Sequence, residues 1–242
     1  MSEGNDILAA LGRDPELREV ISEMESAHPE VRNLLLSFVE DHPDMVPILP
    51  GIVKAYRCIA DCFARGNTLF LCGNGGSFCD SIHISAEFLK SFERKRELSE
   101  AEKGKFRGLP YGDEVADALE KGFPTVVLGL NPALTSAVQN DNRTRYMEFA
   151  QHLYAMARPG DVLIGISTSG NARNVMFAVT VAKALGLTTI GLTGEGGGEL
   201  SGAVDIPIKA PARVTKDVQE KHLPIYHLIC AMVEARFFRE KR

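Results

Sequence analysis

From Thr68 onward, short apolar runs alternate with longer stretches of helical periodicity, and this alternation limits the fold more than any other feature. The five runs are rich in branched side chains, as buried strands are; they span residues 68–72, 125–129, 161–166, 188–192 and 204–208. The helical stretches lie near 80–92, 133–157, 172–185 and 217–240. Strands separated by helices form a parallel sheet with helices on both faces. We therefore expect an α/β fold, a three-layer sandwich around a five-stranded, doubly wound parallel sheet.

The segment before the first run has a helical pattern. Apolar side chains recur at helical spacing in residues 29–40 and 52–64, and a proline-containing segment separates these two stretches. At 242 residues, the chain is long enough for one sizeable domain. We expect residues 1–65 to be a helical region used for oligomerisation, within the same domain as residues 66–242.

Residues 94–123 interrupt the alternation with a strongly charged segment that separates a helix from the next strand. Two interpretations are open. The segment is either a solvated insertion with a short amphipathic helix near 113–121, or a lid or subunit contact beside a site.

Composition restricts the class of protein. The net charge of −5 offers no basic surface for nucleic acid, and no apolar stretch approaches the roughly 20 residues of a membrane span. The N-terminus lacks the order of a signal peptide, and five cysteines, an odd number, favour reduced thiols. We expect a cytoplasmic protein that binds neither nucleic acid nor membrane. Cys79, at the start of a helix, is expected to be a small buried spacer.

Two polar loops follow predicted strands and lead into predicted helices. They are Gly-Asn-Gly-Gly-Ser at 73–77 and Ser-Thr-Ser-Gly-Asn at 167–171. At such junctions, backbone N–H groups and hydroxyls point where the helix dipole favours an anion. Neither loop has the sequence of a nucleotide-binding motif. Because ligands of parallel sheets bind at the carboxyl ends of the strands, the loops predict a site for a phosphorylated small metabolite.

Polar residues that could bind a metal or move protons follow the first loop, and others lie at the start of the last predicted helix. His83 and Glu87 are four residues apart and share a helix face, while Gln219 and His227 are about 80° apart on an ideal helix. His222 is equally compatible with the surface. Two histidines, a glutamate and a glutamine suit a divalent ion such as zinc, and they also suit a general acid/base pair. Spacing leaves both interpretations open.

Together these pieces resemble the sugar isomerase (SIS) domain family, and within it the phosphoheptose isomerases. The matching motifs are CGNGGS at 72–77, HxxxE at 83–87, Asn140-Asp141, STSGN at 167–171, LTGxxGG at 192–198, and QExH followed by a histidine at 219–227. The resemblance covers roughly residues 50–238 except the insertion. It implies a flavodoxin-like sheet, a homotetramer with sites between subunits, and isomerisation of sedoheptulose 7-phosphate to glycero-manno-heptose 7-phosphate.

The resemblance also implies residue roles. Substrate would contact Asn74, Gly75, Gly76, Ser77, Glu87, Asn140, Asp141, Ser167, Thr168, Ser169 and Gln219. Zinc, one ion per subunit, would be held by His83, Glu87, Gln219 and His227. Glu87 and His227 would be the acid/base pair, Glu87 moving the carbon-bound proton and His227 the oxygen-bound one. Because a coordinated imidazole cannot freely exchange that nitrogen's proton, the role of the metal stays open.

Some positions depart from the family pattern, and other functions remain open. Ala172 replaces a phosphate-binding serine, with Arg173 as a candidate charge partner, and Pro224 lies within the last predicted helix, where proline kinks a helix. The alternatives are a non-catalytic SIS module that binds a protein partner, a sugar-phosphate sensor, and an isomerase of another ketose phosphate. The presence of both Glu87 and His227 favours an enzyme.

Overall fold

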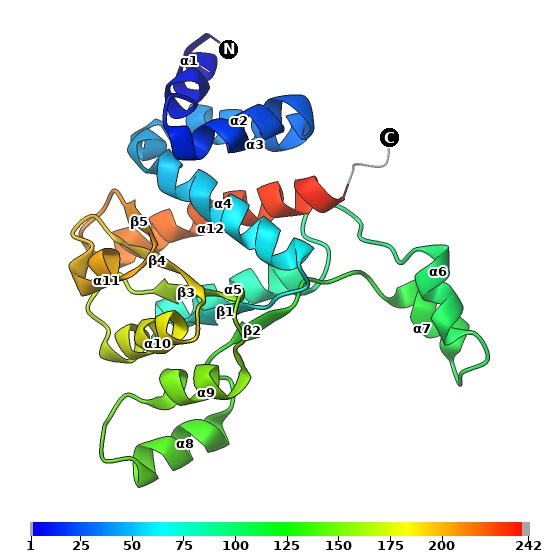
Figure 1. The fold of residues 1–242 in the computed structure, drawn as a ribbon, viewed down its shortest axis with the longest axis vertical. Coiled ribbons are helices and arrows are strands. Elements are labelled where there is room, and N and C mark those ends of the chain that lie inside the picture. Colours follow the sequence, from blue (N-terminus) through cyan, green and yellow to red (C-terminus); the bar gives the residue numbers. More distant parts are fainter. Residues whose placement is uncertain (1, 239–242) are drawn as a thin grey trace.

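A computed structural model describes residues 2–238, and its centre is a sheet of five parallel strands (Figure 1). The strands are β1 (Leu69–Cys72), β2 (Thr125–Val127), β3 (Val162–Ile166), β4 (Thr188–Gly194) and β5 (Ile206–Ala210). Their order is β2-β1-β3-β4-β5, and every neighbouring pair is parallel. The doubly wound α/β fold expected from the alternation is confirmed, because all five predicted strands are present.

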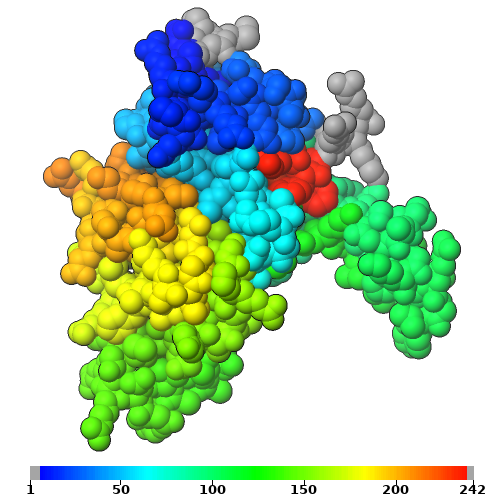
Figure 2. Space-filling model, in the orientation of Figure 1, coloured from blue at the N-terminus to red at the C-terminus, as the bar shows by residue number. Residues whose placement is uncertain are grey.

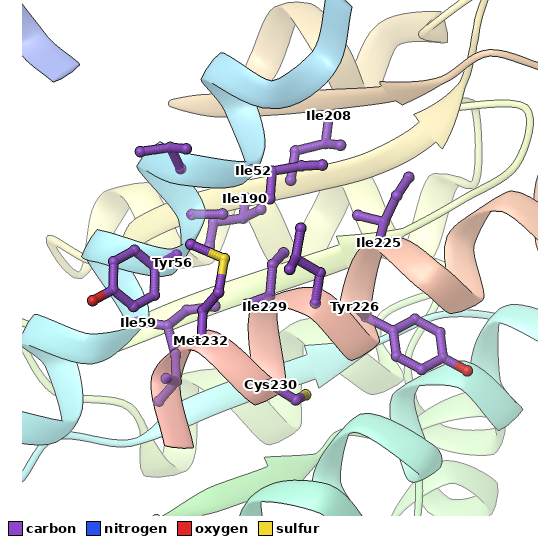
Figure 3. Packing of buried hydrophobic residues seen from close by; sticks show 14 of the residues in the cluster. Ile52, Tyr56, Ile59, Ile190, Ile208, Ile225, Tyr226, Ile229, Cys230 and Met232 are labelled. Carbon is purple, nitrogen blue, oxygen red and sulfur yellow. The ribbon is translucent and has the colours of Figure 1, made fainter. Parts of the chain in front are cut away.

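Helices cover both faces of the sheet, which explains why its strands are apolar throughout. One face packs against α4 (Leu49–Ala64), α5 (Gly76–Leu89) and α12 (Thr215–Phe237). Figure 3 shows Ile52 and Ile59 of α4 and Ile229 of α12 meeting strand residues there. The other face packs against α9 (Glu148–Met156), α10 (Arg173–Ala184) and α11 (Gly198–Ala203).

The N-terminal segment is helical, as expected. It contains α1 (Ser2–Leu11), α2 (Pro15–Ser26), α3 (Pro29–Asp41) and the 3₁₀ helix η1 (Pro43–Ile48) before α4. Prolines occupy the first turns of α2 and α3, where the missing N–H has no helical partner to lose. Apolar side chains of these helices join the same buried cluster as the sheet face under α4 and α12.

The single helix expected over 133–157 is wrong, because the structure has two helices there. They are α8 (Pro132–Asp141) and α9, separated by residues 142–147. The Asn142 side chain accepts a hydrogen bond from the Thr144 N–H (2.8 Å), which offers the backbone a turn instead of a helix. Tyr146 has a φ of 72°, outside the helical region. These local conformations end one helix and start another.

The charged segment forms an arm that projects from the body of the molecule (Figures 1 and 2). Its elements are α6 (Glu100–Lys103), the 3₁₀ helix η2 (Gly104–Phe106) and α7 (Gly112–Ala118), so the helix expected near 113–121 is present but shorter. Its base is anchored, because Arg94 and Arg96 are buried. Within residues 2–238, no helix is both long and apolar enough to cross a membrane.

Candidate active site

The two polar loops lie side by side because they follow adjacent strands. The loop at 73–77 follows β1 and the loop at 167–171 follows β3, and these strands pair directly in the sheet. β2 lies on one side of β1 and β3 on the other, so successive connections run in opposite directions from β1. This is the topological switch point at which open α/β sheets bind ligands. The fold therefore places both loops at the position where such sheets bind ligands.

A pair of amides joins the first loop to the helix that follows the second loop. The Asn74 side chain donates to Asn174 Oδ1 (2.8 Å), and the Asn174 side chain donates back to Asn74 Oδ1 (2.9 Å). Asn174 also donates to the buried carboxylate of Glu148 (2.8 Å). Reciprocal bonds fix the orientation of both amides. Sequence reasoning missed Asn174 and Glu148, although Asn174 stands only three residues beyond the second loop.

The second loop borders an open pocket. Thr168 and Ser169 line a cavity of about 420 Å³ together with residues 194–196 and Arg213, whereas Ser167 is buried. Gly170 allows this loop to approach the segment around Gly197 closely. The φ of Gly170 is 70°, and a Cβ added there would lie 2.0 Å from the Gly197 carbonyl oxygen. The loop thus presents hydroxyls at the strand end, on a backbone packed against the following loop.

The strongest convergence of ionisable groups lies where α5 meets α12. His83 Nε2 is 3.0 Å from Glu87 Oε1 and 3.5 Å from His227 Nε2. One ligand atom from each of these three half-buried residues lies within 4.8 Å of the others. Burial, and then the neighbouring His83, lower the pKa of His227, which favours its neutral form. Two imidazoles and a carboxylate form a donor set suited to zinc.

The other predicted site residues lie outside this cluster, some at the start of α5 and others at the end of α8. The Gln219 amide packs against Gly76, at the start of α5, about 10 Å along the helix from His83 by its rise per residue. Ser77 is buried in the same first turn of α5. Asn140 and Asp141 are exposed at the end of α8, where Asn140 donates to the Asp141 carboxylate (2.8 Å). The structure thus brings His83, Glu87 and His227 together, whereas the Asn140–Asp141 pair lines a different part of the surface.

Arg173, the candidate charge partner near Ala172, lies at the start of α10. Its guanidinium carbon is 5.2 Å from the centre of the Phe177 ring, over which it stacks. The residue is exposed beside the second loop. Its role as a phosphate contact stays a prediction.

Three details of the helices differ from expectation or resolve an open question. Cys79 is exposed, so its prediction as a buried spacer is wrong: the first turn of α5 turns it outward. His222 is fully buried and not on the surface. α12 continues through Pro224, which removes one backbone donor inside the helix without ending it.

The fully buried His222 and the half-buried Asp80 form a pair beside the cluster. Asp80 Oδ2 is 3.9 Å from His222 Nδ1, while His222 Nε2 lies 3.2 Å from the Thr193 carbonyl oxygen. An N–H at Nε2 donates to that carbonyl and leaves Nδ1 without a proton. Burial raises the pKa of Asp80 to about 6 and lowers the pKa of His222 to about 4. Burial therefore disfavours the charged form of each group in the folded protein.

Asp80→Asn is expected to change the pH dependence of stability. Folding raises the pKa of Asp80, so its neutral form stabilises the fold at pH values below the ordinary pKa of 3.8. This contribution is lost as the pH rises through about 6. The variant should gain on the order of 1–2 kcal/mol relative to the wild type between pH 4 and pH 8. Urea unfolding of metal-free protein at both pH values measures this difference, since His222 is common to both proteins.

Asp44→Asn is the matched control. Lys221 donates to the Asp44 carboxylate and lowers its pKa, so this carboxylate stabilises the fold above pH 3.8. The difference between the control variant and the wild type should therefore be nearly the same at pH 4 and at pH 8. An Asp80→Asn difference that is constant from pH 4 to pH 8 would contradict the expectation.

Comparisons with known proteins agree with the motifs and the fold. A family model described as SIS domain matches residues 118–194. The phosphoheptose isomerase of Crocosphaera subtropica is 41% identical over 180 residues, which are 74% of this chain and 79% of that protein. The phosphoheptose isomerase of Geotalea daltonii is 36% identical over 193 residues, 80% of this chain and 88% of that protein.

Solved structures share the fold at lower identity. The phosphoheptose isomerase of Francisella tularensis superposes with a TM-score of 0.64 at 24% identity, covering 88% of this chain and 97% of that one. The Neisseria gonorrhoeae enzyme gives 0.61 at 24% identity, covering 85% and 98%. With identities above 30% to relatives that this chain spans over more than two thirds of their length, the chain belongs to the phosphoheptose isomerase family of SIS-domain proteins.

Proposed function

We propose that this protein is an aldose–ketose isomerase that converts sedoheptulose 7-phosphate to D-glycero-D-manno-heptose 7-phosphate. The observation that carries the proposal is the cluster of His83, Glu87 and His227, with its ligand atoms within 4.8 Å of one another. Glu87 lies on the helix that begins at the first polar loop, so one element contributes both a ligand-binding loop and a base. Family membership supports the same reaction.

The reaction needs two kinds of proton transfer, and the cluster offers a group for each. Moving a carbonyl from C2 to C1 requires removal of a proton from C1, an enediol, and return of a proton at C2. Glu87 is the carboxylate that moves the carbon-bound proton. His227, whose lowered pKa favours a neutral imidazole, moves the proton between the two oxygens.

The two loops position the sugar phosphate for these transfers. Ser77, Ser167, Thr168 and Ser169 bind the phosphate, while Asn74, Gly75 and Gly76 contact the sugar; Asn140, Asp141, Glu87 and Gln219 complete the proposed contacts. The reciprocal bonds between Asn74 and Asn174 hold one contact in a fixed orientation. Fixing the phosphate at one end restricts the reacting carbons to the neighbourhood of Glu87, which is where positioning lowers the barrier.

A zinc ion fits the donor set and is part of the proposal. His83, Glu87 and His227 would hold it, with Gln219 as a fourth ligand if its side chain leaves Gly76. The His83–Glu87 and His83–His227 ligand atoms are 3.0 and 3.5 Å apart, so one ion could be held by all three residues. When bound, the ion would polarise the substrate oxygens and so stabilise charge on the enediol.

The N-terminal helices and the arm are proposed to serve assembly into a homotetramer of a cytoplasmic enzyme. Residues 1–65 and the sheet share one buried cluster, which supports treating them as one domain with residues 66–242. The arm exposes Leu109 and Tyr111, the latter with 79% of its surface free. Apolar side chains on a projecting segment suit a subunit contact better than a solvated insertion.

Isotope incorporation tests the proposed reaction. Purified protein is incubated with sedoheptulose 7-phosphate in deuterated water, and the sugar is followed by NMR. Formation of the aldose, or deuterium at C1 or C2, is the expected result, since the enediol exchanges protons with the medium. Binding without any change in the spectrum would indicate another ketose phosphate or a sensor. Absence of binding would favour a partner-binding module.

A further inference from the structure

Tyr226 contacts the one part of His83 that the three-residue cluster does not use. Its hydroxyl is 3.0 Å from His83 Nδ1, whereas Nε2 of the same ring faces Glu87 and His227. The Tyr226 ring is almost fully buried and packs edge-on against both imidazoles, with centroids 5.4 Å and 5.0 Å apart. None of the motifs that identified the site specifies a residue at this position.

The chemistry of a histidine ligand explains what this contact does for His83. To bind a cation, Nε2 must offer its lone pair, so the single proton of the neutral ring must lie on Nδ1. That N–H requires an acceptor, and the partner that accepts it fixes both the tautomer and the orientation of the ring. In this protein the atom placed to accept it is the phenolic oxygen of Tyr226.

A tyrosine hydroxyl can accept this hydrogen, because its oxygen keeps acceptor lone pairs beside its own O–H. Tyr226 and His83 thus form a pair of polar groups that ends at the cluster.

We propose that Tyr226 is a positioning residue for the metal site: its hydroxyl accepts the Nδ1–H of His83, so that His83 presents Nε2 to a divalent cation. The inference rests on the proposed zinc site and deepens it. Loss of a partner behind a metal-bound histidine typically weakens metal binding by about 10–100-fold. Tyr226→Phe removes this partner while keeping the ring that packs against both histidines.

The experiment is a zinc titration of metal-free protein in competition with a chromophoric chelator. Tyr226→Phe should raise the zinc dissociation constant by about 10–100-fold. Tyr56→Phe is the matched control, because Tyr56 is also fully buried but lies on α4, at the opposite end of the packed cluster in Figure 3. Its zinc affinity should equal that of the wild type.

A spectroscopic readout separates positioning from general loosening of the structure. In zinc-loaded protein with ¹⁵N-labelled histidine, His83 should show a slowly exchanging Nδ1–H, and in Tyr226→Phe this proton should exchange rapidly. Unchanged affinity and exchange in Tyr226→Phe would overturn the inference while leaving the zinc site in place. If wild-type protein does not bind zinc, or binds it equally after His83→Ala, the metal site itself fails and the inference with it.

Discussion

Glu87→Gln is expected to abolish isomerisation while the protein still binds the sugar phosphate. Removal of a general base costs typically 10²–10⁴-fold in rate, and no other carboxylate of the described residues joins the cluster to replace it. Gln has nearly the same shape as Glu, so the loops at 73–77 and 167–171 should keep their positions. Initial rates with sedoheptulose 7-phosphate, together with binding of the sugar phosphate by calorimetry, measure the two effects separately.

The assignment of Glu87 as base must be separated from its proposed role as a metal ligand. Loss of zinc alone would also reduce the rate, so the zinc content of the variant is measured on the same preparation. Deuterium exchange at C1 should disappear even in variant protein that retains zinc. Glu19→Gln, an exposed change on α2, should behave as the wild type. A Glu87→Gln variant that remains active would show that another group removes the proton.

The sequence was sufficient to predict the sheet, because its evidence is local and repeated. Each strand is a short apolar run between helical stretches, and the sheet buries both faces, so every residue of β1 and β3 had to be apolar or small. The incorrect prediction of one helix over 133–157 also has a local cause. The side-chain bond of Asn142 and the positive φ of Tyr146 compete with the helix, and periodicity does not report such competition.

The site was predictable in part. The i, i+4 spacing placed His83 beside Glu87, and the motif near the chain end supplied His227, which the structure brings to 3.5 Å from His83. Asn174, Glu148 and Tyr226 could not be found in this way. Each acts through a contact between residues at least 26 positions apart in the chain, and only the packing of the elements creates that contact.

The base of the arm rests on a buried ion pair that carries no motif. Arg96 and Glu234 are both completely buried, and Arg96 Nε donates to Glu234 Oε1 (2.7 Å). The Glu234 carboxylate also accepts three backbone N–H groups, from Phe92, Glu93 and Arg94 (2.8–3.0 Å). Glu234 lies on α12, the helix that carries His227, so the arm is tied to an element of the site.

The guanidinium of Arg96 connects the same pair to the other helix of the site. It donates to the carbonyl oxygens of Phe88 (2.8 Å) and Glu87 (2.9 Å), at the end of α5. These are carbonyls that the helix itself leaves without partners. The pair therefore fixes the last turn of α5, including the backbone of Glu87, relative to α12.

Glu234→Ala is accordingly expected to destabilise the protein by about 3–5 kcal/mol, because it leaves a buried guanidinium and three backbone donors uncompensated. Urea unfolding at a fixed protein concentration measures the change, and Glu234→Gln, which keeps an acceptor oxygen, should lose less. Glu195→Ala is the control: it breaks a pair with Arg213 in which both side chains are more than half exposed, so it should change the stability far less. If Glu234→Ala costs no more than Glu195→Ala, the arm is not anchored through this pair, and its base must be held by the packing of Arg96 against Phe123 instead.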